Sequence, residues 1–99
     1  MGILRIHPTT LQLHANQPTT CAVEIAGGRP NDLVTIRLSQ TAGIEPLYSA
    51  RSKTQLDGAG DGNAIFEVTL AGPAIASLHA QEEISAVALA PDDITVKVL

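Results

Sequence analysis

Hydrophobic and polar residues alternate along much of the chain, and this period of two is the pattern of a β-strand. The alternating apolar positions fall in three clear segments: Val34, Ile36 and Leu38; Phe66, Val68 and Leu70; Ile94, Val96 and Val98. Each segment has one apolar and one polar face, as expected where a sheet packs on a core on one side only. The pattern therefore predicts an all-β domain.

Residues that break strands separate these segments at short intervals. Pro8 divides the first strand region in two, 27–32 is a predicted loop, and 57–63 is a predicted glycine-rich turn. About seven strands result, which predicts an antiparallel β-sandwich of immunoglobulin-like type with Greek-key connections. A small closed barrel is the alternative fold.

Three stretches have a less regular pattern. One short edge strand is expected around 46–50, and a single helical turn is compatible with 72–82. In 83–90 two registers are open, because either set of alternate apolar residues can face inward.

Composition narrows the class of protein. The chain has 99 residues, which we interpret as one domain over residues 1–99, and a formal net charge of −4. No apolar run approaches the roughly 20 residues of a membrane span, and the start does not resemble a signal peptide. The acidic balance disfavours nucleic acid as a partner, because phosphate binding requires Lys and Arg.

The single cysteine excludes an intrachain disulfide. Cys21 lies in 20–25, where alternate residues are apolar. A buried cysteine behaves as a small hydrophobic residue, so we expect the Cys21 side chain in the core.

A resemblance to bacterial immunoglobulin-like domains is visible in several segments. Residues 4–13 resemble their first strand, which a proline interrupts, and 23–28 with 31–36 resemble their second and third strands. The turn and strand at 57–70 are similar to those of invasin-type domains. The chain lacks the cysteine pair and tryptophan of antibody domains. It therefore resembles the disulfide-free bacterial and phage members.

No catalytic motif is present. The sequence contains no GxSxG, HExxH, CxxC or phosphate-loop pattern, and its three histidines have no ligand spacing. The acidic pairs at 82–83 and 92–93 are interpreted as solvated charges, since strand neighbours point to opposite faces. We therefore expect neither an enzyme nor a cofactor.

Calcium is the one metal for which the sequence contains candidate ligands. Asp57, Asp61 and Asn63 lie in a glycine-rich loop and offer the oxygen ligands that Ca²⁺ prefers. An EF-hand-like loop starting at Asp57 would, however, place Ala59 and Val68 at ligand positions, and neither supplies an oxygen. We expect these residues to shape a turn instead of binding a metal.

The expected function is therefore an interaction surface carried by the fold. The first hypothesis is a virion subunit, capsid-decorating or tail-associated, that is assembled in the cytoplasm and binds a larger protein assembly, with copies of itself as further partners. This interpretation takes the chain as self-contained from Met1 to Leu99 without an export signal. The alternative is a module of an exported adhesin or other cell-surface or secreted protein. A carbohydrate-binding module is disfavoured because Tyr48 and Phe66 are the only aromatic residues.

The binding site is expected at a terminal edge of the sandwich. Alternation turns Ile3 outward in an N-terminal segment that has no charged side chain before Arg5. Lys97 and Leu99 lie in a strand that runs to the C-terminus. Sheet edges carry unpaired backbone groups to which a partner strand can bind. We expect Ile3, Lys97 and Leu99 to form one partner-binding patch.

Overall fold

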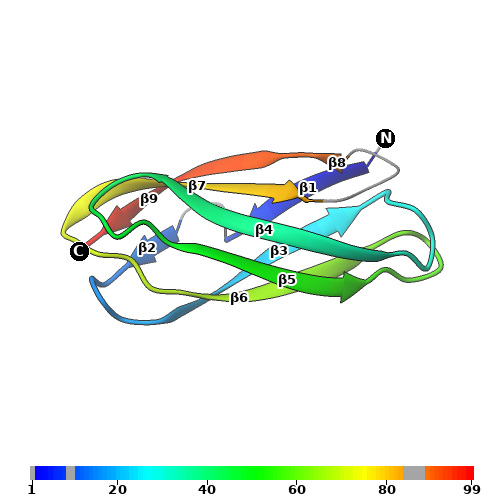
Figure 1. Cartoon of the computed structure of the whole chain (residues 1–99), viewed down its shortest axis with the longest axis horizontal. Helices are drawn as coiled ribbons and strands as arrows, with labels where there is room; N and C mark the ends of the chain where they lie inside the picture. The colour runs from blue at the N-terminus through cyan, green and yellow to red at the C-terminus, as the bar shows by residue number, and fades with distance from the viewer. Residues whose placement is uncertain (1, 9–10, 84–88) are drawn as a thin grey trace.

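The chain folds into a sandwich of two β-sheets (Figure 1). The computed structural model describes residues 2–8, 11–83 and 89–99. Their strands are β1 (Gly2–His7), β2 (Leu11–Leu13), β3 (Thr19–Ala26), β4 (Leu33–Ala42), β5 (Ser49–Gln55), β6 (Gly62–Val68), β7 (Ala74–Glu82), β8 (Leu89–Ala90) and β9 (Asp92–Val98). One sheet has the order β6-β3-β1-β8, and the other has the order β2-β9-β7-β4-β5. No membrane-spanning helix is found among the described residues.

The predicted all-β sandwich is confirmed, with two differences in its strands. The described residues form nine strands, because Pro8 sends β1 and β2 to different sheets and because β8 is a separate short strand. The pairs β1–β8 and β2–β9 are parallel. β1 and β8 lie in the four-stranded sheet, and the strands that follow them, β2 and β9, lie in the five-stranded sheet. Because these two pairs are parallel, the sandwich is not wholly antiparallel.

Two local predictions need correction. The stretch 72–82 contains no helical turn, because 74–82 forms β7 between β9 and β4. Its alanines favour a helix when isolated, but in the sheet they are the small inward-facing residues that the core accommodates. The edge strand expected around 46–50 is β5, which begins later, at Ser49, and is longer. The open register at 83–90 falls largely on residues 84–88, outside the described residues.

The core lies between the sheets and is built from the alternation seen in the sequence. Every strand except β5 contributes buried side chains to it. The inward-facing side chains of β5 are only half-buried. The buried apolar residues are Leu4, Ile6, Leu13, Cys21, Val23, Ile25, Val34, Ile36, Leu38, Leu56, Ala64, Phe66, Val68, Leu70, Ala76, Leu78, Ala80, Leu89, Val96 and Val98.

Cys21 provides a direct test of this core. Its side chain is 1 % exposed, as the alternation predicted, and burial raises the pKa of the thiol. We expect a thiol-reactive dye to label Cys21 slowly in the native protein and rapidly in denaturant, because both access and thiolate formation are suppressed. The substitution Cys21→Ser should lower the free energy of unfolding by about 1–3 kcal/mol.

The Cys21→Ala variant serves as the control for this substitution, because it buries no hydroxyl. Sγ of Cys21 lies 3.5 Å from the His7 carbonyl oxygen, so a serine hydroxyl has one acceptor within reach and the loss should fall in the lower part of the range. Fast labelling of the native protein would contradict the buried placement.

Candidate functional site

A charged face lies on the outer side of the five-stranded sheet, where β4, β5 and β7 run side by side. In register, Arg37 of β4 lies opposite Arg51 of β5, and Thr35 lies opposite Lys53. Arg37, Arg51 and Lys53 are three of the six Lys and Arg residues of the chain. A protein of net charge −4 thus gathers half of its cations on one surface. We call Arg37, Arg51, Lys53 and Glu83 the charged face.

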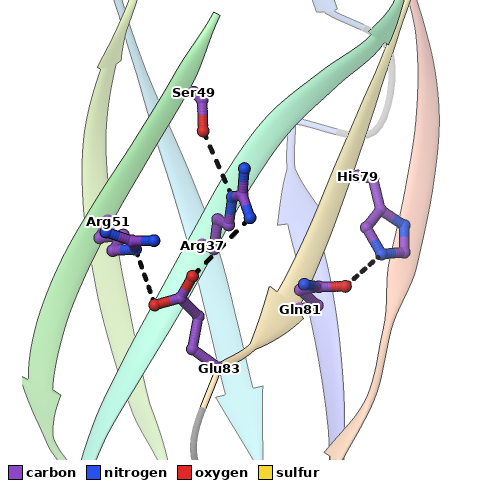
Figure 2. Close-up of polar contacts among 6 residues, drawn as sticks. All are labelled: Arg37, Ser49, Arg51, His79, Gln81 and Glu83. Atoms are coloured by element: carbon purple, nitrogen blue, oxygen red, sulfur yellow. Dashed lines mark hydrogen bonds and ion pairs between the residues drawn. The ribbon is translucent and has the colours of Figure 1, made fainter.

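Glu83 holds the two arginines together. Oε2 of Glu83 lies 2.7 Å from Nε of Arg51, and Oε1 lies 3.9 Å from Nη1 of Arg37 (Figure 2). Nε of Arg37 also donates to Oγ of Ser49 over 3.3 Å. Two arginines directly opposite each other would repel, and the Glu83 carboxylate between them offsets that repulsion. Lys53 forms no ion pair with any described residue, so the charged face has a net positive charge.

A histidine lies on the same sheet beside the charged face. Nδ1 of His79 is 2.7 Å from Oδ1 of Asp93. Figure 2 shows the second contact of this ring, in which Nε2 is 3.1 Å from Oε1 of Gln81. Both ring nitrogens therefore face an oxygen atom. Among the described residues, no group of three or more His, Cys, Asp or Glu side chains is placed to hold a metal ion.

The interpretation of the acidic pairs as solvated charges holds for Asp93, whose side chain is exposed, but is wrong for Glu82, Glu83 and Asp92. Glu83 bridges two arginines, and Asp93 contacts His79. Asp92 accepts a hydrogen bond of 2.8 Å from the Ile6 backbone N–H and so links the two sheets. Both carboxylate oxygens of Glu82 are buried and have no hydrogen-bond partner among the described residues. Alternation correctly places the members of each pair on opposite faces, but the partners come from distant strands.

The carboxylates of the Asp57–Asn63 turn accept hydrogen bonds from backbone N–H groups of the turn and of the neighbouring loop. Oδ1 of Asp57 accepts hydrogen bonds from the N–H groups of Asp61 (3.0 Å) and Ala59 (2.8 Å), and these bonds lower the pKa of Asp57. Oδ1 of Asp61 accepts from the Gly27 N–H over 3.0 Å. Asn63 lies in β6, opposite Glu24. These contacts are those of a turn in which acidic side chains cap backbone N–H groups.

We expect stability to be independent of calcium. Backbone N–H groups bond Oδ1 of both Asp57 and Asp61, and among the described residues these carboxylates belong to no group of three that is placed to hold a metal ion. The melting temperature should be equal in chelator and in millimolar Ca²⁺, with Mg²⁺ as the control for ionic strength. A ligand at 100 times its dissociation constant adds about 2.7 kcal/mol. A calcium-specific rise of several degrees would therefore contradict this assignment.

The predicted terminal patch is not formed. Ile3 of β1 lies between β3 and β8, and Lys97 of β9 lies between β2 and β7, so neither residue is at an open edge. The start of β1 and the end of β9 also lie at opposite ends of the molecule (Figure 1), whose extents are 41 × 18 × 18 Å. Ile3 therefore cannot share a patch with Lys97 and Leu99. The open edges of the two sheets are instead β5, β2, β6 and β8.

Lys97 and Leu99 do lie together, around a shallow apolar hollow of about 350 Å³. Pro73, Ala74, Ile75 and Val98 also line it, and Ile75 is 63 % exposed. The register explains this arrangement, because Ile75 of β7 lies directly opposite Lys97 of β9.

Comparison with known proteins gives structural neighbours only. No family model and no curated protein matches the sequence. The CARDB domain of a Pyrococcus furiosus protein, solved in complex with di-metal ions, aligns over 100 % of this chain and 94 % of its own, with a TM-score of 0.65 and 15 % identity. The superoxide reductase (neelaredoxin) of Ignicoccus hospitalis aligns over 98 % and 80 %, with a TM-score of 0.63 and 19 % identity.

A third neighbour is much longer than this chain. The β-glucosidase of Listeria innocua, solved in complex with glucose, aligns over 100 % of this chain but 16 % of its own, with a TM-score of 0.59 and 16 % identity. At these identities the likeness shows the fold alone. The likeness to the CARDB domain supports the immunoglobulin-like sandwich.

Sequence reasoning missed the charged face. Arg37, Arg51 and Lys53 occupy polar positions of alternating segments, and the sequence does mark them as outward-facing. What it does not give is the pairing of β4 with β5 and β7, which brings the cations together with Glu83. Only a register prediction for these three strands would have identified the site.

Proposed function

We propose that this chain is a non-catalytic immunoglobulin-like module that binds a larger protein assembly through its charged face. The observation that carries the proposal is the gathering of Arg37, Arg51 and Lys53 on one exposed sheet surface of an acidic protein. Charges arranged in this way steer association and select a partner of opposite charge.

The finer proposal is a virion subunit, either capsid-decorating or tail-associated. Its support is the resemblance of residues 4–13, 23–28, 31–36 and 57–70 to disulfide-free bacterial and phage immunoglobulin-like domains. Such a subunit needs a stable fold and a specific surface, and it needs no catalytic centre.

The second candidate is a module of a multidomain surface protein. Two observations favour it: the fold recurs as a small part of the β-glucosidase chain, and the two termini lie at opposite ends of a rod (Figure 1). That arrangement suits domains joined end to end.

Binding of charge variants to the purified assembly tests the proposed function. The Arg51→Glu/Lys53→Glu double variant reverses two charges of the charged face, and Arg5→Glu/Lys97→Glu makes the same net change elsewhere. In co-sedimentation with phage particles that lack the chain, we expect wild type and the control to bind. The charged-face variant should bind at least about tenfold more weakly.

The location of the bound chain separates the two candidates. Recovery with particles would support the virion subunit, whereas recovery with the cell envelope as part of a longer polypeptide would support the surface module. Equal binding by both double variants would overturn the role of the charged face.

A further inference from the structure

The exposed edge of β5 lies next to the charged face, and with β6 it is one of the two longest edge strands of the sandwich. β5 is the last strand of its sheet and spans seven residues, Ser49–Gln55. Among the described residues, β4 is the one strand that pairs with it. An open edge carries N–H and C=O groups that another strand can pair with.

The hydrogen-bond pattern shows which residues of β5 present those groups. The two ends of the β4–β5 pair are fixed by the bonds from Gln40 N–H to Tyr48 O and from Leu56 N–H to Asp32 O, both 2.8 Å long. In an antiparallel ladder, directly bonded pairs alternate with pairs whose backbone groups point away. Even-numbered residues of β5 therefore bond to β4. The N–H and C=O groups of Arg51 and Lys53 point to the open edge.

Arg51 and Lys53 are also the positively charged residues of this edge. Their side chains lie on the outer face, where a strand added to β5 would place its own side chains about 5 Å away. A partner residue opposite Arg51 and another opposite Lys53 would be two positions apart along the added strand. Favourable pairing thus requires acidic residues at positions i and i+2.

The charges also oppose pairing between two copies of this chain. If the β5 strands of two copies paired antiparallel with Ser52 at the centre, Arg51 of each copy would lie opposite Lys53 of the other. If Arg51 were at the centre, the two Arg51 residues would lie opposite each other. Like charges in directly opposite positions destabilise a sheet. The edge is therefore protected against self-association but remains complementary to an acidic strand.

We propose that β5 binds an extended acidic segment of a partner protein, which adds as a further strand to the five-stranded sheet. This inference rests on the proposed function, and it specifies the partner chemistry as acidic residues at alternate positions. Backbone hydrogen bonds from Arg51 and Lys53 supply affinity, and the facing cations supply specificity.

A synthetic peptide tests the proposal directly. The probe is a nine-residue peptide, acetylated and amidated, in which Glu alternates with Thr and Val. Its control has the same sequence with N-methyl groups on the amides that face β5, so charge is kept and backbone bonding is lost. We expect the unmodified peptide to bind at least about tenfold more tightly. Amide exchange at Arg51 and Lys53 should slow on binding.

Two variants of one residue separate charge from backbone. Lys53→Gln removes the cation only, whereas Lys53→Pro also removes the N–H that points to the open edge and leaves the even-numbered ladder bonds intact. We expect Lys53→Pro to bind the peptide more weakly than Lys53→Gln. Should the proline variant not fold, the N-methyl comparison on the wild-type protein still decides the question.

Three results would overturn the inference. They are equal binding of both peptides, a dimer that forms through β5, and displacement of the peptide by a DNA oligonucleotide that protects the same amides. Equal binding of both peptides, together with normal binding to the assembly, would reject strand addition and leave the proposed function standing.

Discussion

Replacing Glu82 by methionine is expected to stabilise the protein. Both Glu82 carboxylate oxygens are buried and unpaired among the described residues, at a hollow that has no room for a water molecule. The hollow is lined by Gly28, Arg29, Asp32, Val34, Leu56 and Leu89. An unpaired buried polar group costs about 1–3 kcal/mol. Methionine has a similar shape and no charge, so Glu82→Met should raise the free energy of unfolding by about 1–2 kcal/mol at pH 7.

The gain from Glu82→Met should depend on pH. Burial, and secondly the charge of Asp32, raise the pKa of Glu82 in the folded state above the ordinary value of 4.5. The folded protein therefore favours the neutral acid, and the wild type loses stability as pH rises from 4.5 through the raised pKa. The difference between variant and wild type should be largest above that pKa and smallest below pH 4.5.

Glu83→Met is the matched control for this experiment. The neighbouring carboxylate points outward and pairs with Arg51 and Arg37, so its removal should lower stability, by less than about 1 kcal/mol. Urea unfolding of the three proteins between pH 4 and pH 8 measures both effects. A Glu82→Met variant no more stable than the wild type at pH 7 would show that the carboxylate is satisfied.

Gly60→Ala is expected to cause the largest loss of stability. Gly60 has a φ of +82°, and a Cβ atom at this position would overlap the Gly28 carbonyl oxygen. The two loops are also joined by a hydrogen bond from the Gly28 N–H to the Gly60 carbonyl oxygen, 2.8 Å long. The left-handed conformation costs an alanine about 1–2 kcal/mol. The overlap adds a similar amount, for a total loss of roughly 3 kcal/mol.

Gly58→Ala in the same turn is the control. A Cβ atom at Gly58 would have no neighbour within 4 Å, so this variant should stay within about 0.5 kcal/mol of the wild type. For a domain of this size, the loss at Gly60 corresponds to a fall of roughly 10–20 °C in melting temperature. Equal melting temperatures of the two variants would contradict the geometry of the turn.

The inward positions of the core were predictable because they depend on local backbone geometry. In an extended chain, successive side chains point to opposite sides, so Val34, Ile36 and Leu38 had to share a face in any sheet. The burial of Cys21 followed from the same rule. The same rule predicts that Ile94 faces the core, but its side chain, near the start of β9, is only half-buried.

The error at 72–82 shows where local preference fails. Ala74, Ala76 and Ala80 favour a helix in isolation, and their spacing is compatible with either structure. The segment forms a strand because β9 on one side and β4 on the other hydrogen-bond to its backbone along its length.

Local sequence was enough to predict the two-sided character of β4, β6 and β9, the loop at 27–32 and the turn at 57–63, because these features depend on residues close together in the chain. The edge positions of the strands and the meeting of distant charges followed from the tertiary fold. Glu83 reaches Arg37 and Arg51, and Asp92 reaches the Ile6 backbone, across separations of 32 to 86 residues. Such contacts depend on the order and register of strands, which alternation within a single strand does not specify.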